Sequence, residues 1–207
     1  MRTRVKICGL TDVEMAHVAV SHGADAIGLV FYPPSPRFIE IAAAAEIVSS
    51  MPAFVTCVGL FVNADQQDVT KAIELTGIDL LQFHGNECPD YCAGFDFPYI
   101  KALRMKEDIN LLRERERYAS ARNLLLDTYI PGAPGGTGES FNWERIPQEL
   151  APEIILAGGL DPENVDSAIE AVKPYAVDVS GGVESSKGIK SAEKIKQFMR
   201  GVSIADK

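Results

Sequence analysis

The chain has 207 residues, with 20 lysines and arginines against 29 aspartates and glutamates, which gives a formal charge of −9. Its hydrophobic content of 46% excludes a disordered chain, which could not bury enough apolar surface to fold. The acidic balance argues against a general nucleic-acid or anionic-membrane binder, since these need a basic face. An anionic small-molecule substrate stays open, provided that its site is locally positive.

Length and patterning favour a single domain over residues 1–207, because α/β barrels commonly run to about 200–250 residues as one domain. The N-terminus MRTRVKICGL turns polar before a long apolar region forms, so no signal peptide is expected. No apolar run approaches the roughly 20 residues of a membrane span. We therefore expect a cytoplasmic protein.

The four cysteines, Cys8, Cys57, Cys88 and Cys92, are expected to be free thiols in that compartment. Cys88 and Cys92 could share a helix face as a metal-binding pair. No second pair of Cys or His with matching spacing accompanies them, so no metal site is predicted. Cys57 lies within FVTCVGLF and is expected to be a core residue.

Short apolar runs alternate with helical patterns along the chain. The runs are nearly continuous, which is typical of strands covered on both faces. Eight strands are predicted, over residues 3–8, 25–31, 54–61, 79–84, 99–103, 123–127, 153–157 and 176–180.

Helix signals lie between these runs. Thr11 begins a T-x-x-E capping box that predicts a helix ending near His22. Asp161 stands before Pro162, as a cap stands before the first helical position, and residues 191–200 predict an amphipathic final helix. Eight βα units predict either a closed barrel or a large open doubly wound sheet. The count of eight, and the lack of G-x-G-x-x-G after the first strand, favour a single (β/α)₈ TIM barrel.

The active site of such a barrel lies at the C-terminal ends of its strands. Strand alternation places Lys6 and Cys8 inside the barrel, and a buried lysine needs a partner. Asp178, on the adjacent closing strand, is the best candidate. A neighbouring cation would favour the thiolate of Cys8, which makes Cys8 a catalytic candidate rather than a small core residue.

Polar side chains also follow other strands. Asp127 ends an apolar strand, and the long glycine-rich segment 128–140 after it is typical of a mobile lid. A carboxylate beneath a lid favours acid–base chemistry over capping. His84 is open between a ligand contact and a satisfied strand-end histidine, and Arg37 lies in the loop after the second strand.

Glycine pairs follow the last two strands, at Gly158-Gly159 and at Gly181-Gly182. Loops at these two places often bind phosphate in barrels, where bare backbone N–H groups meet the anion. Tight turns that use glycine for positive φ are the alternative. Because both expected places carry a pair, we predict a phosphate site there, with Ser180 as a further member.

At these residues the chain resembles the phosphoribosylanthranilate isomerase family. The matching motifs span nearly the whole chain: KICGL (6–10), GADAIGLVFYPPSPR (23–37), VGLFVN (58–63), LQFHG (81–85), LLLDT (124–128), GGTGESFNW (135–143), LAGGLDPENV (156–165) and AVDVSGGVE (176–184). Asn142 stands where the family commonly has Asp, at a predicted helix start where either residue caps. Phe83 stands where Leu is usual.

The resemblance implies an isomerase of tryptophan biosynthesis that needs neither a metal nor an organic cofactor. Its Amadori rearrangement turns N-(5-phosphoribosyl)anthranilate into 1-(2-carboxyphenylamino)-1-deoxyribulose 5-phosphate. By resemblance, Asp127 is the general acid, Cys8 the general base, and Arg37 the residue that holds the anthranilate carboxylate. His84 and Asp178 are further substrate-binding candidates, Asp178 through a ribulose hydroxyl.

Two alternatives remain at this point: another phosphosugar isomerase of the same fold, or a non-catalytic phosphate-binding barrel. An indole-glycerol-phosphate synthase would need a further lysine and glutamate pattern, and a histidine-pathway aminoaldose isomerase would carry Asp in place of Cys8. The expected partner is a phosphorylated small molecule, with no nucleic acid and no membrane. A monomer and a homodimer are both compatible with the sequence.

Overall fold

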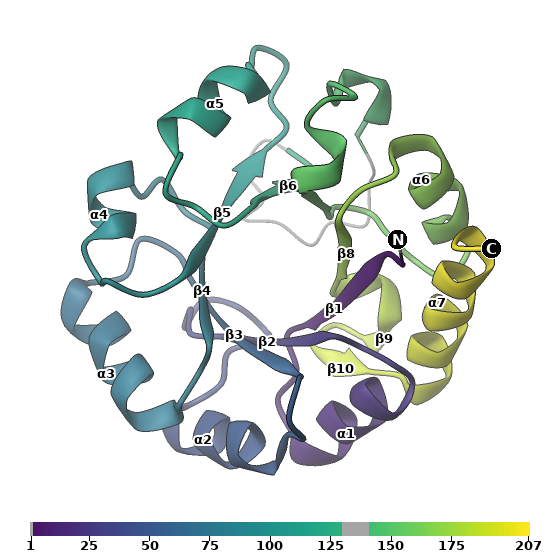
Figure 1. Ribbon diagram of the computed structural model, residues 1–207. Helices are drawn as coiled ribbons and strands as arrows, with labels where there is room; N and C mark the ends of the chain where they lie inside the picture. Colours follow the sequence, from purple (N-terminus) through teal and green to yellow (C-terminus); the bar gives the residue numbers. More distant parts are fainter. Residues whose placement is uncertain (1, 130–140) are drawn as a thin grey trace.

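Eight parallel strands close into a barrel in which β1 pairs with both β2 and β8. The computed structural model describes residues 2–129 and 141–207 (Figure 1). The strands are β1 (Arg4–Cys8), β2 (Ala26–Val30), β3 (Thr56–Phe61), β4 (Leu80–Phe83), β5 (Tyr99–Arg104), β6 (Leu124–Asp127), β7 (Ile154–Leu156) and β8 (Ala176–Val179). Each corresponds to one predicted strand, and the predicted (β/α)₈ barrel is confirmed.

Helices form a ring around the strands (Figure 1). They are α1 (Val13–Ser21), α2 (Ile41–Ser50), α3 (Gln66–Thr76), α4 (Pro89–Ala93), α5 (Leu111–Arg117), α6 (Val165–Val172) and α7 (Ala192–Ala205). Between β6 and β7 the described residues form two short 3₁₀ helices, η1 (Trp143–Arg145) and η2 (Ala151–Glu153), instead of an α-helix. A third, η3 (Gly181–Val183), and an antiparallel ribbon of β9 (Glu184–Ser186) and β10 (Ile189–Lys190) follow β8.

Two helix starts refine the predictions. Asp12, not Thr11, caps α1, because its Oδ1 accepts the N–H of Met15 at 2.8 Å. The cap predicted at Thr11 therefore lies one residue before the cap in the structure. Asp161 does act as a cap, since Oδ1 accepts the N–H groups of Glu163 and Asn164, although regular helix begins only at Val165. Asn142 caps η1 through the N–H of Glu144.

Buried apolar side chains form two layers, which fix where a site can lie, and a small third cluster of Cys8, Val30 and Leu60. The larger layer packs between the strands and the helices. A smaller one fills the barrel itself, with Ile100, Ala102, Leu125, Ile155, Ala157 and Ala176. Because this interior is packed, the space for a ligand lies above it, at the C-terminal ends of the strands.

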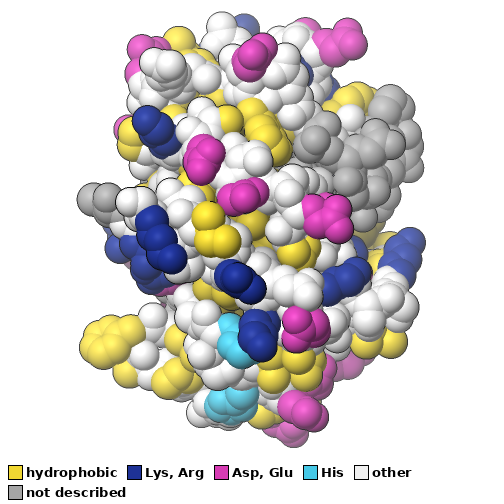
Figure 2. Space-filling model, turned by 90° about the vertical axis from the view of Figure 1, so that its right-hand side faces the viewer, with side chains coloured by type: hydrophobic (Ala, Val, Ile, Leu, Met, Phe, Trp, Pro, Cys, Tyr) yellow, Lys and Arg dark blue, Asp and Glu magenta, His cyan; other side chains and the backbone are white. Residues whose placement is uncertain are grey.

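The outer surface mixes both signs of charge. On the side that carries α6 and α7, acidic and basic side chains are interspersed (Figure 2). All four cysteines are free thiols; Cys88 is exposed whereas Cys92 is buried in α4, so the two do not share a face. In the described part of the chain, no helix is long and apolar enough to cross a membrane.

Candidate active site

A cavity of about 370 Å³ opens at the C-terminal ends of the strands. It brings together every predicted site residue, from strands β1, β6 and β8 and from the loops after β2, β4, β7 and β8: Cys8, Arg37, His84, Asp127, Gly158, Gly159, Asp178, Ser180, Gly181 and Gly182. Of the predicted lid, residues 130–140 lie outside the described part.

Cys8 lies beside a buried ion pair at the seam of the barrel. Lys6 Nζ donates to Asp178 Oδ1 at 2.9 Å, and the two side chains are 5% and 7% exposed. The predicted partner of Lys6 is therefore confirmed. A Cβ built on Gly28 of β2 would lie 2.8 Å from Cys8 Sγ and 2.9 Å from Lys6 Nζ. The missing side chain at Gly28 thus makes room for the thiol and the ammonium side by side.

Burial and three neighbouring charged groups act on the pKa of Cys8. Burial raises the pKa of Cys8 above its usual value, while Lys6 and Lys190 act in the opposite direction. Desolvation outweighs the cations, and the carboxylate of Asp178 raises the pKa further. The direction in which Lys6 acts is as expected.

Asp127 ends a chain of polar contacts that starts on β4. Its Oδ2 lies 3.0 Å from His84 Nε2, and its Oδ1 accepts the N–H of Thr128 at 2.9 Å. His84 Nδ1 lies 3.1 Å from Nε2 of Gln82, which is fully buried. His84 is thus a satisfied histidine and a wall of the cavity at once, so the two readings left open for it are compatible.

Arg37 is held by Glu184. Its Nε and Nη2 donate to Oε1 and Oε2 of that carboxylate at 2.6 and 2.9 Å. Glu184 also accepts from Lys190 Nζ at 2.7 Å and from the N–H of Gly188 at 3.0 Å. Burial opposes the ionisation of Glu184, but the hydrogen bonds from Arg37 and Lys190 outweigh it and lower its pKa to about 2. One edge of the guanidinium is therefore fixed by an ionised carboxylate.

The glycine loops after β7 and β8 pack against each other. Gly158 and Gly159 have φ of 79° and 68°, a region that side chains rarely adopt. A Cβ on Gly182 would come 2.0 Å from the carbonyl oxygen of Leu160, so only glycine allows the two loops to meet. Ser180 Oγ donates to the carbonyl oxygen of Cys8 at 3.0 Å, which joins these loops to β1.

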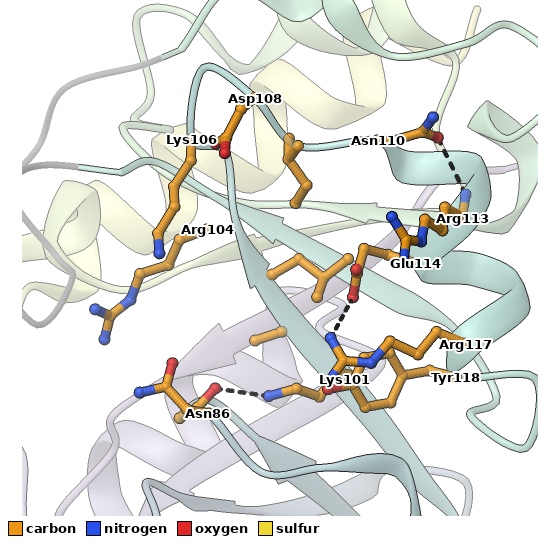
Figure 3. A pocket seen from close by; sticks show the side chains of 14 residues that line it. Asn86, Lys101, Arg104, Lys106, Asp108, Asn110, Arg113, Glu114, Arg117 and Tyr118 are labelled. Atoms are coloured by element: carbon orange, nitrogen blue, oxygen red, sulfur yellow. Dashed lines mark hydrogen bonds and ion pairs between the residues drawn. The ribbon is translucent and has the colours of Figure 1, made fainter.

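A second cavity, of about 400 Å³, lies next to the first around the end of β5 (Figure 3). Its charged lining consists of Lys101, Arg104, Lys106, Arg113 and Arg117, against Asp108 and Glu114. Two observations place it beside the first cavity: Gly85 of its wall directly follows His84, and Arg104 pairs in register with Asp127. It is therefore a local excess of positive charge in an acidic chain.

Comparison with known proteins agrees with the motifs. The family model described as N-(5'-phosphoribosyl)anthranilate (PRA) isomerase matches residues 5–201. The N-(5'-phosphoribosyl)anthranilate isomerase of Pseudomonas putida (strain F1) is 55% identical over 202 residues, which cover 98% of each chain. That of Pseudomonas aeruginosa (strain UCBPP-PA14) is 53% identical over 199 residues, or 96% of this chain and 94% of the relative.

Solved structures agree as well. The phosphoribosyl anthranilate isomerase of Thermotoga maritima superposes with a TM-score of 0.88 at 38% identity, covering 97% of this chain and 98% of that one. A structure of phosphoribosyl anthranilate isomerase with reduced 1-(o-carboxyphenylamino)-1-deoxyribulose 5-phosphate gives a TM-score of 0.85 at 36% identity, with the same coverage of 97% and 98%. By these matches, the chain belongs to the N-(5'-phosphoribosyl)anthranilate isomerase family.

Proposed function

We propose that this chain is the isomerase of tryptophan biosynthesis that converts N-(5'-phosphoribosyl)anthranilate into 1-(2-carboxyphenylamino)-1-deoxyribulose 5-phosphate. One observation carries the proposal: Cys8 and Asp127, from the ends of β1 and β6, line one cavity together with Arg37 and the two glycine loops. The cavity thus combines two proton-transfer groups with candidate partners for a carboxylate and a phosphate. A non-catalytic barrel would not need the two proton-transfer groups, Cys8 and Asp127.

Asp127 is the general acid of the proposed reaction. It gives its proton to the furanose ring oxygen, the C1′–O bond breaks, and the ring opens to an iminium ion. Hydrogen bonds from the N–H of Thr128 and with His84 fix the direction of the carboxyl group. The burial of Asp127, which is 7% exposed, keeps competing water away from the proton.

Cys8 is the general base. It removes the C2′ proton of the iminium ion, which leaves an enolamine that tautomerises to the ketone. The iminium makes that proton more acidic, and its positive charge favours the thiolate in the same way as Lys6 does. The thiolate is therefore favoured when the substrate needs it, although burial raises the pKa of Cys8 in the free site.

The anionic ends of the substrate have separate partners. Glu184 occupies the Nε and Nη2 edge of Arg37, so the Nη1 side of the fork is the part that can take the anthranilate carboxylate. Backbone N–H groups around Gly158-Gly159 and Ser180 to Gly182 would hold the phosphate. Asp178 would contact a ribulose hydroxyl with the oxygen that Lys6 leaves free.

Cys8→Ala and Asp127→Asn test the proposal. Each should lower kcat by about 10²–10⁴-fold, the usual contribution of a proton-transfer group. Turnover is followed by the fluorescence of the anthranilate group. Cys88→Ala, which removes an exposed cysteine, is the matched control and should keep the wild-type kcat. Near-native kcat in Cys8→Ala would show that the base is another group, and an inactive wild type would refute the function.

A further inference from the structure

The side-chain amide of Gln82 is held at one end only. Gln82 is fully buried on β4 and lines the candidate active site. Its Nε2 lies 3.1 Å from His84 Nδ1, whereas its Oε1 is buried without a hydrogen-bond partner among the described residues. A half-turn of the amide would exchange these two atoms and break no other hydrogen bond to the described residues. Gln82 can thus offer His84 either a donor or an acceptor.

Whether Nδ1 of His84 needs a hydrogen-bond donor or an acceptor depends on how many protons His84 and Asp127 hold between them. His84 Nε2 lies 3.0 Å from Asp127 Oδ2. When Asp127 is ionised and His84 is neutral, the Nε2–H group donates to Asp127 and Nδ1 accepts from Gln82 Nε2. That arrangement matches the observed contacts, but it lacks the proton that a general acid must supply.

Uptake of one proton changes this arrangement. The incoming proton binds Nδ1 of His84, and the proton already on Nε2 is shared with, or passed to, Oδ2 of Asp127. The pair then gains one positive charge, and Asp127 can act as an acid. The new Nδ1–H group is buried and needs an acceptor, since an unpaired buried donor is costly. Gln82 Nε2 cannot accept, but its unpartnered Oε1 can.

We propose that Gln82 is a positioning residue whose amide turns over when the His84–Asp127 pair takes up its catalytic proton. Before proton uptake, Nε2 of Gln82 donates to Nδ1 of His84. After proton uptake, Oε1 of Gln82 accepts the new Nδ1–H group. His84 keeps its orientation in both states, so Gln82 holds the acid in place through His84. This role rests on the proposed isomerase function and adds to it.

The charges around the pair must be constant for a test by pH. The other titratable or charged side chains that line the cavity or end the neighbouring strand are Cys8, Tyr32, Arg37, Asp178, Lys187 and Arg104. On β5, Lys101 also lies beside the pair: it donates to the carbonyl oxygens on both sides of His84 and is itself paired with Glu87. Gln82→Met removes the amide without adding a charge, so these groups keep their surroundings. Gln82→Glu offers an acceptor without a turn of the side chain but adds a carboxyl group, so Gln82→Met is the variant that tests the amide at constant charge.

Kinetics with these variants form the first part of the experiment. Gln82→Met removes a hydrogen bond from both protonation states, but the bond to the protonated pair is the stronger, since it involves a charged group. The variant should therefore lower kcat about tenfold or more at pH 8 with KM changed less than about threefold, and the alkaline fall of kcat should start at lower pH. In Gln82→Glu the alkaline fall should start at higher pH. Gln197→Met, at an exposed glutamine of α7, is the matched control and should change none of these quantities. A wild-type pH profile in Gln82→Met would overturn the proposal.

The second part uses the wild-type protein and needs no variant to fold. The chain has three histidines, so ¹⁵N NMR of the rings can follow His84 with His17 and His22 as references. When acidification protonates Nδ1 of His84, the side-chain amide signals of Gln82 should shift in the same step, while those of Gln197 should not. Gln82 signals that stay constant through that step would overturn the proposal. This readout is independent of turnover, so it separates failure of the inference from failure of the proposed function.

Discussion

Lys6 and Asp178 form a buried ion pair across the two strands that close the barrel, with Nζ and Oδ1 2.9 Å apart although the two residues are 172 positions apart in the chain. Burial opposes the charge on Lys6, but Asp178, together with Cys8 in its ionised form, outweighs it, and the pKa of Lys6 is raised. The ammonium group therefore stays charged beside the thiol of Cys8. Lys6 lowers the pKa of Cys8, whereas Asp178, the carboxylate that keeps Lys6 charged, raises the pKa of Cys8.

Lys6→Met should move the alkylation of Cys8 to higher pH. Lys6 lowers the pKa of Cys8, so its loss leaves burial and Asp178 to raise that pKa further. The rate of alkylation by iodoacetamide, measured against pH by mass spectrometry of the Cys8 peptide, gives the midpoint. Asp178→Asn is the control of opposite sign and should move the midpoint to lower pH. An unshifted profile in Lys6→Met would show that the ammonium does not act on Cys8.

Glu184→Gln should weaken substrate binding rather than chemistry. The amide cannot accept two hydrogen bonds from the Arg37 fork, so one edge of the guanidinium loses its fixed direction. We expect KM to rise about tenfold while kcat stays within about threefold, as for a lost ground-state contact. Glu184→Asp, which keeps the charge on a shorter side chain, should recover part of the affinity. A fall of kcat at constant KM would place Glu184 in the proton-transfer steps instead.

Acid should destabilise the wild type partly through Glu184. Its pKa in the folded protein is lowered to about 2, against about 4.3 for an unfolded glutamate. A depressed carboxylate pKa stabilises the fold above the unfolded value, and this stabilisation is lost as the pH falls from about 4.3 towards 2. Urea unfolding at pH 7 and at pH 3 measures it. The gap in stability between wild type and Glu184→Gln should narrow at pH 3, and a constant gap would contradict the assignment.

The strands and the position of the site follow from local features of the sequence. Apolar runs predict the strands, and the barrel rule then collects Cys8, Asp127 and Asp178 at one end. Gln82 could have been found in the same way, because it lies two residues before His84 and so shares its face of the strand. Gly28 could have been found only from register, since it lies opposite Cys8 in the pairing of β1 with β2.

Other features have no local signal. Glu184 meets Arg37 from 147 residues away, and no spacing rule connects two such positions before the loops are placed. The net shift in the pKa of Cys8 depends on burial, which the presence of Lys6 two residues earlier does not reveal. The α-helix expected between β6 and β7 is replaced in the described residues by short 3₁₀ helices, beginning at the Asn142 cap.

The basic cavity around the end of β5 bears on how an acidic chain attracts its substrate. The proposed substrate carries a phosphate and a carboxylate, and a net charge of −9 repels it at long range. This cavity, next to the candidate active site, is lined by five cationic side chains and two carboxylates (Figure 3). Lys101 is paired with Glu87 and Arg117 with Glu114. Lys106 and Arg113 are exposed there, and neither forms an ion pair with a described residue.

The double variant Lys106→Gln/Arg113→Gln should therefore lower kcat/KM about threefold at about 20 mM ionic strength and leave kcat unchanged. At about 0.5 M salt, where the Debye length is only about 4 Å, the difference from wild type should vanish. Lys71→Gln/Lys196→Gln removes the same two charges from exposed positions on α3 and α7 and is the matched control. An equal loss in the control would mean that only net charge matters, and a loss that persists at high salt would point to a direct contact rather than to attraction at a distance.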